Sequence, residues 1–251
     1  MAANLIDMSG RVVLITGGSR GLGRAMALGF AEAGADLAIA SRKLESCQAT
    51  AAEIEALGRQ AFVQACHVGY WDQIDALVEA VYGHYGKVDV LINNAGMSPH
   101  YDRPVDISEA LYDKVLEVNL KGAFRACANV GQRMLEAGGG AIINISSAAA
   151  IRPRKDIITY AAAKAGLNAM TEAFADAYGP SVRVNAIMPG PFLTDISKAW
   201  DMAAFAERAR TSIALGRGGQ AEEIVGAALY LASDQASYTT AAILKIDGGS
   251  L

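Results

Sequence analysis

Residues 16–23 read TGGSRGLG, and this glycine-rich turn joins a predicted strand at 11–16 to a predicted helix that ends at Gly34. The strand reads RVVLIT, a β-branched run of the kind that forms buried parallel strands. Glycines at 17, 21 and 23 allow the backbone to turn sharply and to approach a pyrophosphate, whose charge then lies at the helix N-terminus. Such a turn alone is also compatible with a purely structural role, but the strand before it and the helix after it favour dinucleotide binding.

The rest of the chain alternates strands with helices. Further strands are predicted at 36–40, 61–65, 88–92, 141–145, 182–188 and 242–246. Helices are predicted at 44–57, 71–85, 157–178 and 222–232, with one or two short helices at 194–212. One long helix is predicted from 106 to about 137, beginning at a capping box formed by Asp106 and Glu109. This rhythm predicts an α/β fold with a parallel, doubly wound sheet, in one domain spanning residues 1–251.

The composition excludes several classes of protein. The 251 residues are 52% hydrophobic and 19% charged, which is typical of a globular chain. The net charge of -4 and the lack of a Lys/Arg run give no reason to expect nucleic acid as a partner. No apolar run is long enough to span a bilayer, and the first ten residues lack a basic region followed by an apolar one. The sequence therefore predicts a cytoplasmic protein without a membrane partner.

Cysteine and histidine give no sign of a metal site. The three cysteines are odd in number and widely spaced, which fits reduced thiols better than disulfides. The three histidines form no i,i+4 ligand pair. We therefore predict no bound metal, and we expect the partners to be small molecules or other copies of the chain.

The end of the second predicted strand reads Ser41-Arg42-Lys43, about 20 residues after the glycines, where an adenosine ribose would lie. An NAD-binding protein usually carries a carboxylate there, but Asp36 lies at the other end of the strand. Arg42, Lys43 and Arg20 could instead pair with a 2′-phosphate. This pattern favours NADP(H), while NAD(H) stays possible, because Arg42 and Lys43 could also be the solvated start of the next helix.

Tyr160 and Lys164 stand four residues apart in the predicted helix at 157–178, so their side chains share one face. A lysine cation beside a tyrosine favours the phenolate, which allows the tyrosine to exchange a proton with a carbonyl or an alcohol. A solvated helix face would show the same spacing. Asn119, in the middle of the long predicted helix, is a poor helix former and suggests a hydrogen bond.

With these residues in place, the chain closely resembles the short-chain dehydrogenase/reductase family along its whole length. The motifs that carry the resemblance are TGGSRGLG at 16–23, NNAG at 93–96, Asn119, Ser147, Tyr160 with Lys164, and PG at 189–190. The resemblance implies a seven-stranded Rossmann-like sheet, a catalytic tetrad and a homo-oligomer, either dimer or tetramer. An alanine-rich face after Tyr160 fits packing between subunits, although burial within one subunit would explain it too.

The resemblance also implies a role for each tetrad residue. Tyr160 would be the general acid in reduction and the general base in oxidation, and Ser147 would hydrogen-bond the substrate oxygen. Lys164 would lower the Tyr160 pKa and hold the nicotinamide ribose, and Asn119 would hold a water that links Lys164 to solvent. The implied cofactor contacts are Gly17, Ser19, Arg20, Gly21, Leu22, Gly23, Ser41, Arg42, Lys43, His67, Val68, Asn93, Ala95, Gly96, Tyr160, Lys164, Pro189, Gly190 and Thr194.

One departure from the family pattern follows the third strand. Members often show Asp-Val there, with the aspartate meeting the adenine, whereas this chain has His67-Val68. A neutral histidine nitrogen could accept from the adenine amine, or His67 could be a tolerated surface residue.

By resemblance, the substrate lies among residues 97–105, 148–156 and 191–215. The last segment is a predicted lid, because it follows a Pro-Gly hinge, although its apolar residues could equally form a small core under a fixed flap. Arg152, Arg154 and Lys155 could attract an anionic substrate or simply be solvated.

We therefore predict an oxidoreductase that interconverts a carbonyl, of ketone or 3-oxoacyl type, and a secondary alcohol with NADP(H). The alternatives are an NAD-dependent dehydrogenase acting on sugars, polyols or hydroxysteroids, and a dinucleotide-sensing protein without catalysis.

Overall fold

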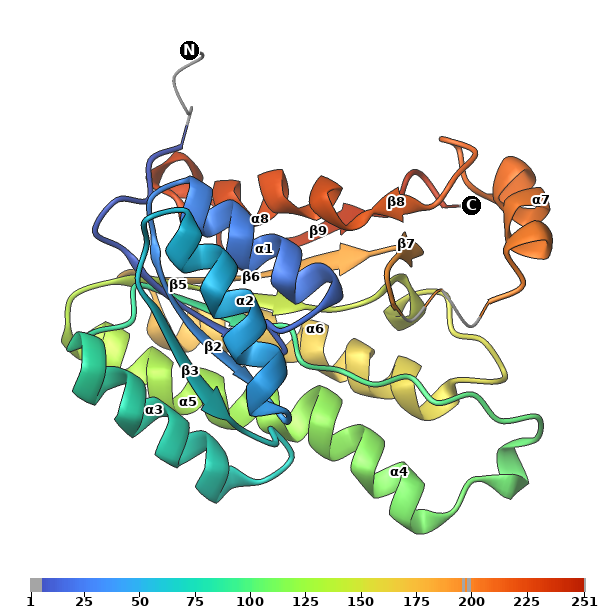
Figure 1. Cartoon of the computed structure of the whole chain (residues 1–251). Coiled ribbons are helices and arrows are strands. Elements are labelled where there is room, and N and C mark those ends of the chain that lie inside the picture. The colour runs from blue at the N-terminus through green and yellow to red at the C-terminus, as the bar shows by residue number, and fades with distance from the viewer. Residues whose placement is uncertain (1–5, 196, 198–199, 251) are drawn as a thin grey trace.

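The computed structural model describes residues 6–195, 197 and 200–250. A sheet of seven parallel strands, in the order β3-β2-β1-β4-β5-β6-β9, forms the centre of the molecule (Figure 1). The strands are β1 (Val12–Thr16), β2 (Asp36–Ser41), β3 (Ala61–Ala65), β4 (Val90–Asn93), β5 (Gly140–Ile145), β6 (Val182–Pro189) and β9 (Ile243–Ile246). The strand order reverses between β1 and β4, and doubly wound sheets bind ligands at the carboxyl ends of the strands at such a point. The predicted fold class is confirmed.

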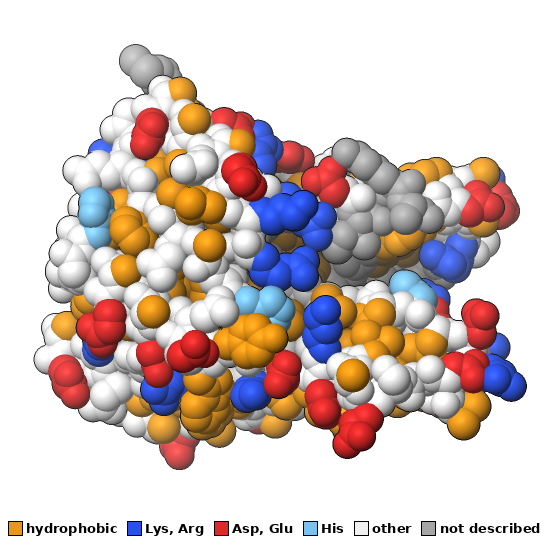
Figure 2. Space-filling view, turned by 60° about the horizontal axis from the view of Figure 1, so that its bottom comes forward, with side chains coloured by type: hydrophobic (Ala, Val, Ile, Leu, Met, Phe, Trp, Pro, Cys, Tyr) orange, Lys and Arg blue, Asp and Glu red, His pale blue; other side chains and the backbone are white. Residues whose placement is uncertain are grey.

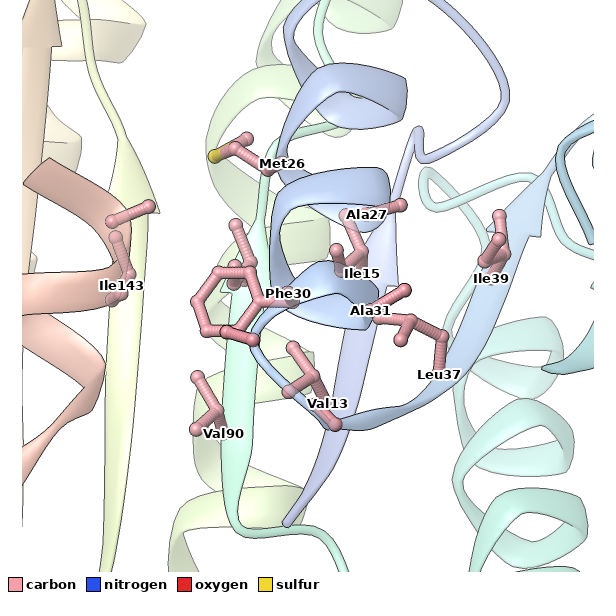
Figure 3. Packing of buried hydrophobic residues seen from close by; sticks show 14 of the residues in the cluster. Val13, Ile15, Met26, Ala27, Phe30, Ala31, Leu37, Ile39, Val90 and Ile143 are labelled. Atoms are coloured by element: carbon pink, nitrogen blue, oxygen red, sulfur yellow. The ribbon is translucent and has the colours of Figure 1, made fainter. Parts of the chain in front are cut away.

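Helices cover both faces of the sheet (Figure 1). One face carries α1 (Gly21–Glu32), α2 (Leu44–Ala56) and α8 (Val225–Ala232), and the other carries α3 (Trp71–Tyr85), α5 (Gly122–Glu136) and α6 (Ile158–Tyr178). Figure 3 shows Phe30 of α1 near Val13 and Val90 of the sheet. Because both faces are buried, the strands read as nearly continuous apolar runs.

The long helix predicted from 106 to 137 is present as one helical run from 109 to 136, but its start and its cap are not as predicted. The helix begins after Ser108, whose Oγ accepts a hydrogen bond from Leu111 N at 3.2 Å. Asp106 cannot cap it because its carboxylate binds the Arg103 guanidinium, in the short 3-10 helix Pro104–Asp106. The helix is also interrupted: α4 (Glu109–Leu116) passes through a π turn at Glu117–Lys121 before α5 begins.

The segment predicted as a lid lies beside the C-terminus. It contains β7 (Phe192–Leu193), which pairs with β8 (Gly219–Gln220), and α7 (Met202–Ser212). Residues 196, 198 and 199 lie outside the described part. Phe205, Ala209 and Ile213 form a small separate core with Leu193 and Trp200, as expected for apolar residues under a flap. Whether residues 191–215 move as a lid stays a prediction.

Ala241 offers a test of backbone strain next to β9. Its φ is +58°, the left-handed region that a Cβ disfavours by about 1–2 kcal/mol. Ala241→Gly should therefore raise the free energy of unfolding by roughly 0.5–1 kcal/mol, after the extra chain entropy of glycine is subtracted. Urea unfolding measures the change. Ala137→Gly is the matched control, because Ala137 has a φ of -81° and the variant protein should be less stable. If both variants lose stability, the Ala241 backbone is not strained.

Candidate active site

Ser147 and Tyr160 meet at the carboxyl edge of the sheet. Ser147 follows β5, and Tyr160 lies in the first turn of α6. Burial raises the pKa of Tyr160, whereas a hydrogen bond with the Ser147 side chain lowers it. The two side chains are therefore neighbours, and their joint binding of one ligand oxygen stays a prediction.

Lys164 is buried beneath Tyr160 on the same face of α6. Only 3% of Lys164 is exposed, and its Nζ donates a hydrogen bond to Ile145 O at 2.7 Å. Nζ lies 5.8 Å from the centre of the Tyr160 ring. Burial lowers the pKa of Lys164 to about 8. Burial raises the pKa of Tyr160 and the Ser147 side chain lowers it. The predicted lowering of the Tyr160 pKa by Lys164 stays a prediction.

Asn119 lies in the π turn between α4 and α5, and 1% of it is exposed. Its Nδ2 donates to Met97 O at 2.8 Å and to Val115 O at 2.9 Å, and its Oδ1 accepts from Met97 N at 3.2 Å. A π turn breaks the regular helical hydrogen-bonding pattern, so the side chain supplies a partner for Val115 O. The predicted hydrogen bond of Asn119 thus holds the segment after β4 against the helix. Its role in holding a water stays a prediction.

Gly96, in the segment after β4, lies next to Asn119 and Lys164. A Cβ built on Gly96 would lie 3.0 Å from Asn119 Oδ1 and 3.8 Å from Lys164 Nζ. Asn119 of the π turn and Lys164 of α6 therefore both lie at this segment.

The glycine turn has the features that a pyrophosphate requires. A Cβ on Gly23 would lie 2.2 Å from Gly17 O, and one on Gly17 would lie 2.9 Å from Ala95 Cα. Among the described residues, no side chain caps helix α1 and no acidic residue lies in its first turn, so its first N–H groups are free to bind an anion. The residues present therefore fit a dinucleotide phosphate group.

Asn94 and Thr16 join this turn to β4, and sequence reasoning did not single them out. Asn94 Nδ2 donates to Thr16 O at 3.1 Å and to Gly17 O at 3.0 Å. Thr16 Oγ1 accepts from Asn94 N at 3.1 Å. The one sequence feature that could have pointed to this contact is the second asparagine of the NNAG motif, which is Asn94. Asn93, which was predicted to contact the cofactor, instead turns its side chain into the core, where Nδ2 donates to Asn144 Oδ1 at 2.9 Å. Any cofactor contact of Asn93 must come from its backbone.

Three cations lie around the ends of β1 and β2. Arg20, Arg42 and Lys43 are exposed, and no acid forms a salt bridge with any of them among the described residues. Figure 2 shows basic side chains gathered around a hollow in the middle of one face. Ser41 Oγ is engaged locally, with Lys43 O at 3.3 Å and Cys47 Sγ at 3.1 Å.

The predicted residues His67 and Val68 follow β3. Val68 lines a narrow recess together with Thr16, Ala95 and Gly122, so this loop reaches the glycine turn. The His67 ring packs against Tyr70 with ring centres 4.7 Å apart. The structure thus brings the loop after β3 to the edge of the predicted cofactor crevice.

A cavity of about 470 Å³ lies between the start of α1 and the segment after β7. Gly21, Arg24, Thr194 and Glu222 are among its lining residues, so two predicted cofactor contacts, Gly21 and Thr194, face one space. Gly190 packs on Asp247, where a Cβ would lie 2.7 Å from Asp247 Cα.

The cations predicted for an anionic substrate are largely engaged within the chain. Arg154 binds the Asp156 carboxylate, with Nη2 2.6 Å from Oδ2, and Arg152 donates to Ser250 O. Lys155 is exposed. These contacts favour the solvated-loop interpretation over anion recognition.

The described residues show neither a metal-binding cluster nor a membrane-spanning helix. They contain no group of three or more His, Cys, Asp or Glu side chains arranged to hold a metal ion. None of the helices they form is both long and apolar enough to cross a membrane.

Comparison with known proteins supplies relatives along nearly the whole chain. A family model described as Enoyl-(Acyl carrier protein) reductase matches residues 17–250. The chain is 37% identical over 243 residues to 3-oxoacyl-(acyl-carrier-protein) reductase FabG of Thermotoga maritima, covering 96% of this chain and 98% of that protein. It is 38% identical over 252 residues to L-rhamnose 1-dehydrogenase (NAD(P)(+)) of Sphingomonas sp., covering 96% of each.

A solved structure is similarly close. The structure of 7 alpha-hydroxysteroid dehydrogenase complexed with NADH and 7-oxo glycochenodeoxycholic acid has a TM-score of 0.93 and 32% identity, covering 98% of this chain and 96% of that chain. These three relatives all carry the names of oxidoreductases.

Proposed function

The chain belongs to the short-chain dehydrogenase/reductase family and is an oxidoreductase acting on alcohol and carbonyl substrates, and from that premise we propose that it interconverts a ketone-type or 3-oxoacyl carbonyl and a secondary alcohol with NADP(H). The observation that carries the proposal is that Ser147 neighbours Tyr160 and lowers its pKa, while the buried Lys164 lies 5.8 Å from the centre of the Tyr160 ring. The membership in an enzyme family, together with the intact tetrad, argues against the dinucleotide-sensing alternative.

Each residue has a chemical task in the proposed reaction. In reduction, Tyr160 Oη donates its proton to the substrate oxygen, and Ser147 Oγ donates a hydrogen bond to the same oxygen. In oxidation, Tyr160 takes the proton from the alcohol. Lys164, when charged, favours the Tyr160 phenolate and offsets the burial that raises the Tyr160 pKa. The bound nicotinamide would supply or accept the hydride.

The cofactor preference rests on three cations that form no salt bridge with any described residue. Arg20, Arg42 and Lys43 offer charge-assisted hydrogen bonds to a 2′-phosphate, which NADP(H) carries and NAD(H) does not. The alternative, an NAD-dependent dehydrogenase of sugars, polyols or hydroxysteroids, is kept because relatives named for such substrates match the chain. Assay of a carbonyl and alcohol panel with NADPH and NADH in parallel separates the two. Equal or better rates with NADH would overturn the NADP(H) proposal.

Removing two of the cations tests the same proposal on the protein itself. The double variant Arg42→Ala, Lys43→Ala should raise the KM for NADPH about tenfold or more, because hydrogen bonds to charged groups contribute about 1.5–3 kcal/mol each. The KM for NADH should change little. Lys114→Ala, at an exposed lysine of α4, is the control and should change neither. An equal loss with both dinucleotides would argue against a phosphate contact.

We also propose a cytoplasmic homo-oligomer built through α6. Of the five alanines on the predicted face, Ala161 is buried within the subunit. The other four are exposed in the single chain, so burial within one subunit does not explain them: Ala162, Ala165, Ala169 and Ala173. Sedimentation velocity measures the oligomeric state in solution, and a protein that stays monomeric would contradict the proposed oligomer.

A further inference from the structure

The segment 97–101, which follows β4, links two elements that carry tetrad residues. At its start, Met97 N donates to Asn119 Oδ1 at 3.2 Å, and Met97 O accepts from Asn119 Nδ2 at 2.8 Å. At its end, Tyr101 contacts the first turn of α6, in which Tyr160 lies. This strap, residues 97–101, therefore connects the π turn that holds Asn119 to the helix that holds Tyr160.

The strap supplies a cap that α6 lacks. The N-cap residue of α6 is Ile157, whose apolar side chain forms no capping hydrogen bond. Tyr101, 57 residues earlier than the first residue of α6, provides one, because Tyr101 Oη accepts from Ile158 N at 2.6 Å. One of the N–H groups that a helix leaves unsatisfied at its start is thus bound by the strap.

Two further contacts hold the end of the strap on Asp156, just before α6. Tyr101 N donates to Asp156 O at 3.3 Å, and His100 Nδ1 lies 2.9 Å from Asp156 Oδ2. Burial raises the pKa of Asp156, but hydrogen bonds from Arg154 and His100 lower it, to about 2. An ionised carboxylate only accepts hydrogen bonds, so Nδ1 of His100 is the donor. The strap is thus fixed both to the helix and to the residues that lead into it.

The position of this first turn determines where the Tyr160 phenol lies. Ile158 and Tyr160 are two residues apart in α6, so a displacement of the turn moves both. Ser147 belongs to a different element, where it caps the 3-10 helix Ala148–Ala150, so its distance from Tyr160 depends on how α6 is held. A displacement of about 1 Å at reacting groups can lower a rate about a hundredfold.

The contact of Tyr101 with α6 is suited to setting position more than stability. The hydrogen bond is exposed, and 46% of Ile158 is accessible to solvent. Water can therefore bind the Ile158 N–H when the hydroxyl of Tyr101 is removed, and no buried polar group is left without a partner. The loss should be felt in the geometry of the first turn.

We propose that Tyr101 is a positioning residue, which holds the first turn of α6 so that the Tyr160 phenol stays against Ser147. His100 assists it by holding the strap on Asp156. The proposal rests on the proposed function, in which Tyr160 exchanges the proton, and deepens it. Tyr101 acts on the reaction through the backbone of α6.

Carbon-13 NMR of the full chain, labelled at the Cζ of its nine tyrosines, tests the positioning without a substrate. The Tyr160 signal is assigned with Tyr160→Phe, and at pH 7 it reports the hydrogen bonding of that phenol. Ser147→Ala should shift this signal, and Tyr101→Phe should shift it in the same direction. In the double variant, Tyr101→Phe should add little, because the contact it maintains is already gone. A signal that is unmoved by Tyr101→Phe, or a shift of equal size in both backgrounds, would overturn the proposal.

Steady-state kinetics with acetoacetyl-coenzyme A, a 3-oxoacyl thioester, and NADPH gives a second readout. Tyr101→Phe should lower kcat about tenfold, while the KM for NADPH and the midpoint of urea unfolding stay close to those of the wild type. Tyr112→Phe, at an exposed tyrosine of α4, is the matched control and should change none of them. A KM for the thioester that rises tenfold with kcat unchanged would show that Tyr101 binds the substrate directly, and would overturn the proposal.

A conservative pair at His100 tests the other contact. His100→Ala should lower kcat about threefold, the effect of one hydrogen bond. His100→Asn should restore it, because the asparagine amide can donate to the Asp156 carboxylate in place of Nδ1. An equal loss in both variants would exclude His100 from the positioning.

The two measurements separate this proposal from the proposed function. A wild type that turns over no carbonyl or alcohol of the panel, while its Tyr160 signal still moves with Tyr101→Phe, would contradict the proposed function alone. An active wild type whose Tyr160 signal does not respond to Tyr101→Phe would overturn the positioning proposal alone.

Discussion

Tyr160→Phe should lower kcat by about a thousandfold, within the range that general acid–base groups contribute. The phenol is the group placed beside Ser147 to exchange a proton with the substrate oxygen. Phenylalanine keeps the ring, and with it the contact between the Tyr160 ring and Lys164 Nζ, but has no proton to give. The rate of the chemical step should therefore fall, while dinucleotide affinity and thermal stability stay close to those of the wild type.

Tyr178→Phe is the matched control for this variant. Tyr178 lies at the other end of α6, and its hydroxyl donates to Ala128 O at 3.2 Å. Its loss should lower the free energy of unfolding by about 1 kcal/mol and leave kcat unchanged. Single-turnover and steady-state rates, with calorimetry for dinucleotide binding, distinguish the two variants. A Tyr160→Phe protein that keeps more than a tenth of the wild-type kcat would show that another group supplies the proton.

The sequence predicted the parts of the fold that depend on local pattern. The βαβ alternation placed the strands and most helices, because buried strands and amphipathic helices differ in period over a few residues. The spacing of Tyr160 and Lys164 likewise predicted a shared helix face. The error at Asp106 has a local cause too: the Arg103 guanidinium binds the Asp106 carboxylate, and Ser108 caps the helix instead.

The rest of the site depends on contacts between residues far apart in the chain. Asn94 holds the glycine turn through Thr16, 78 residues away, and no local pattern predicts that pairing. The Lys164 side chain bonds Ile145 O, 19 residues earlier, so its burial becomes visible only once α6 packs on β5. The direction of the Tyr160 pKa shift followed from the same burial, which the motif alone does not reveal.

Lys164→Met should both reduce turnover and remove a pH-dependent part of the stability. Turnover should fall about a hundredfold or more, because Tyr160 loses the only cation placed against its ring in the described part of the chain. The stability effect follows from the shifted pKa. It is about 8 in the folded protein and near 10.5 when the chain is unfolded, because burial disfavours the charged amine.

The sign of this effect is set by proton binding. Between pH 8 and pH 10.5 the unfolded chain holds the Lys164 proton more tightly than the folded one, so this residue makes stability rise with pH. The buried thiols act oppositely, since burial raises the pKa of Cys66 to about 11 and of Cys127 to about 12. Both proteins keep Cys66 and Cys127, so the contribution of the thiols drops out when the free energy of unfolding of Lys164→Met is subtracted from that of the wild type. Urea unfolding across this range should therefore show the wild type gaining up to about 3 kcal/mol relative to the variant. A difference that stays flat with pH would mean that the Lys164 amine is not desolvated, and that it reaches Tyr160 through water instead of through the protein interior.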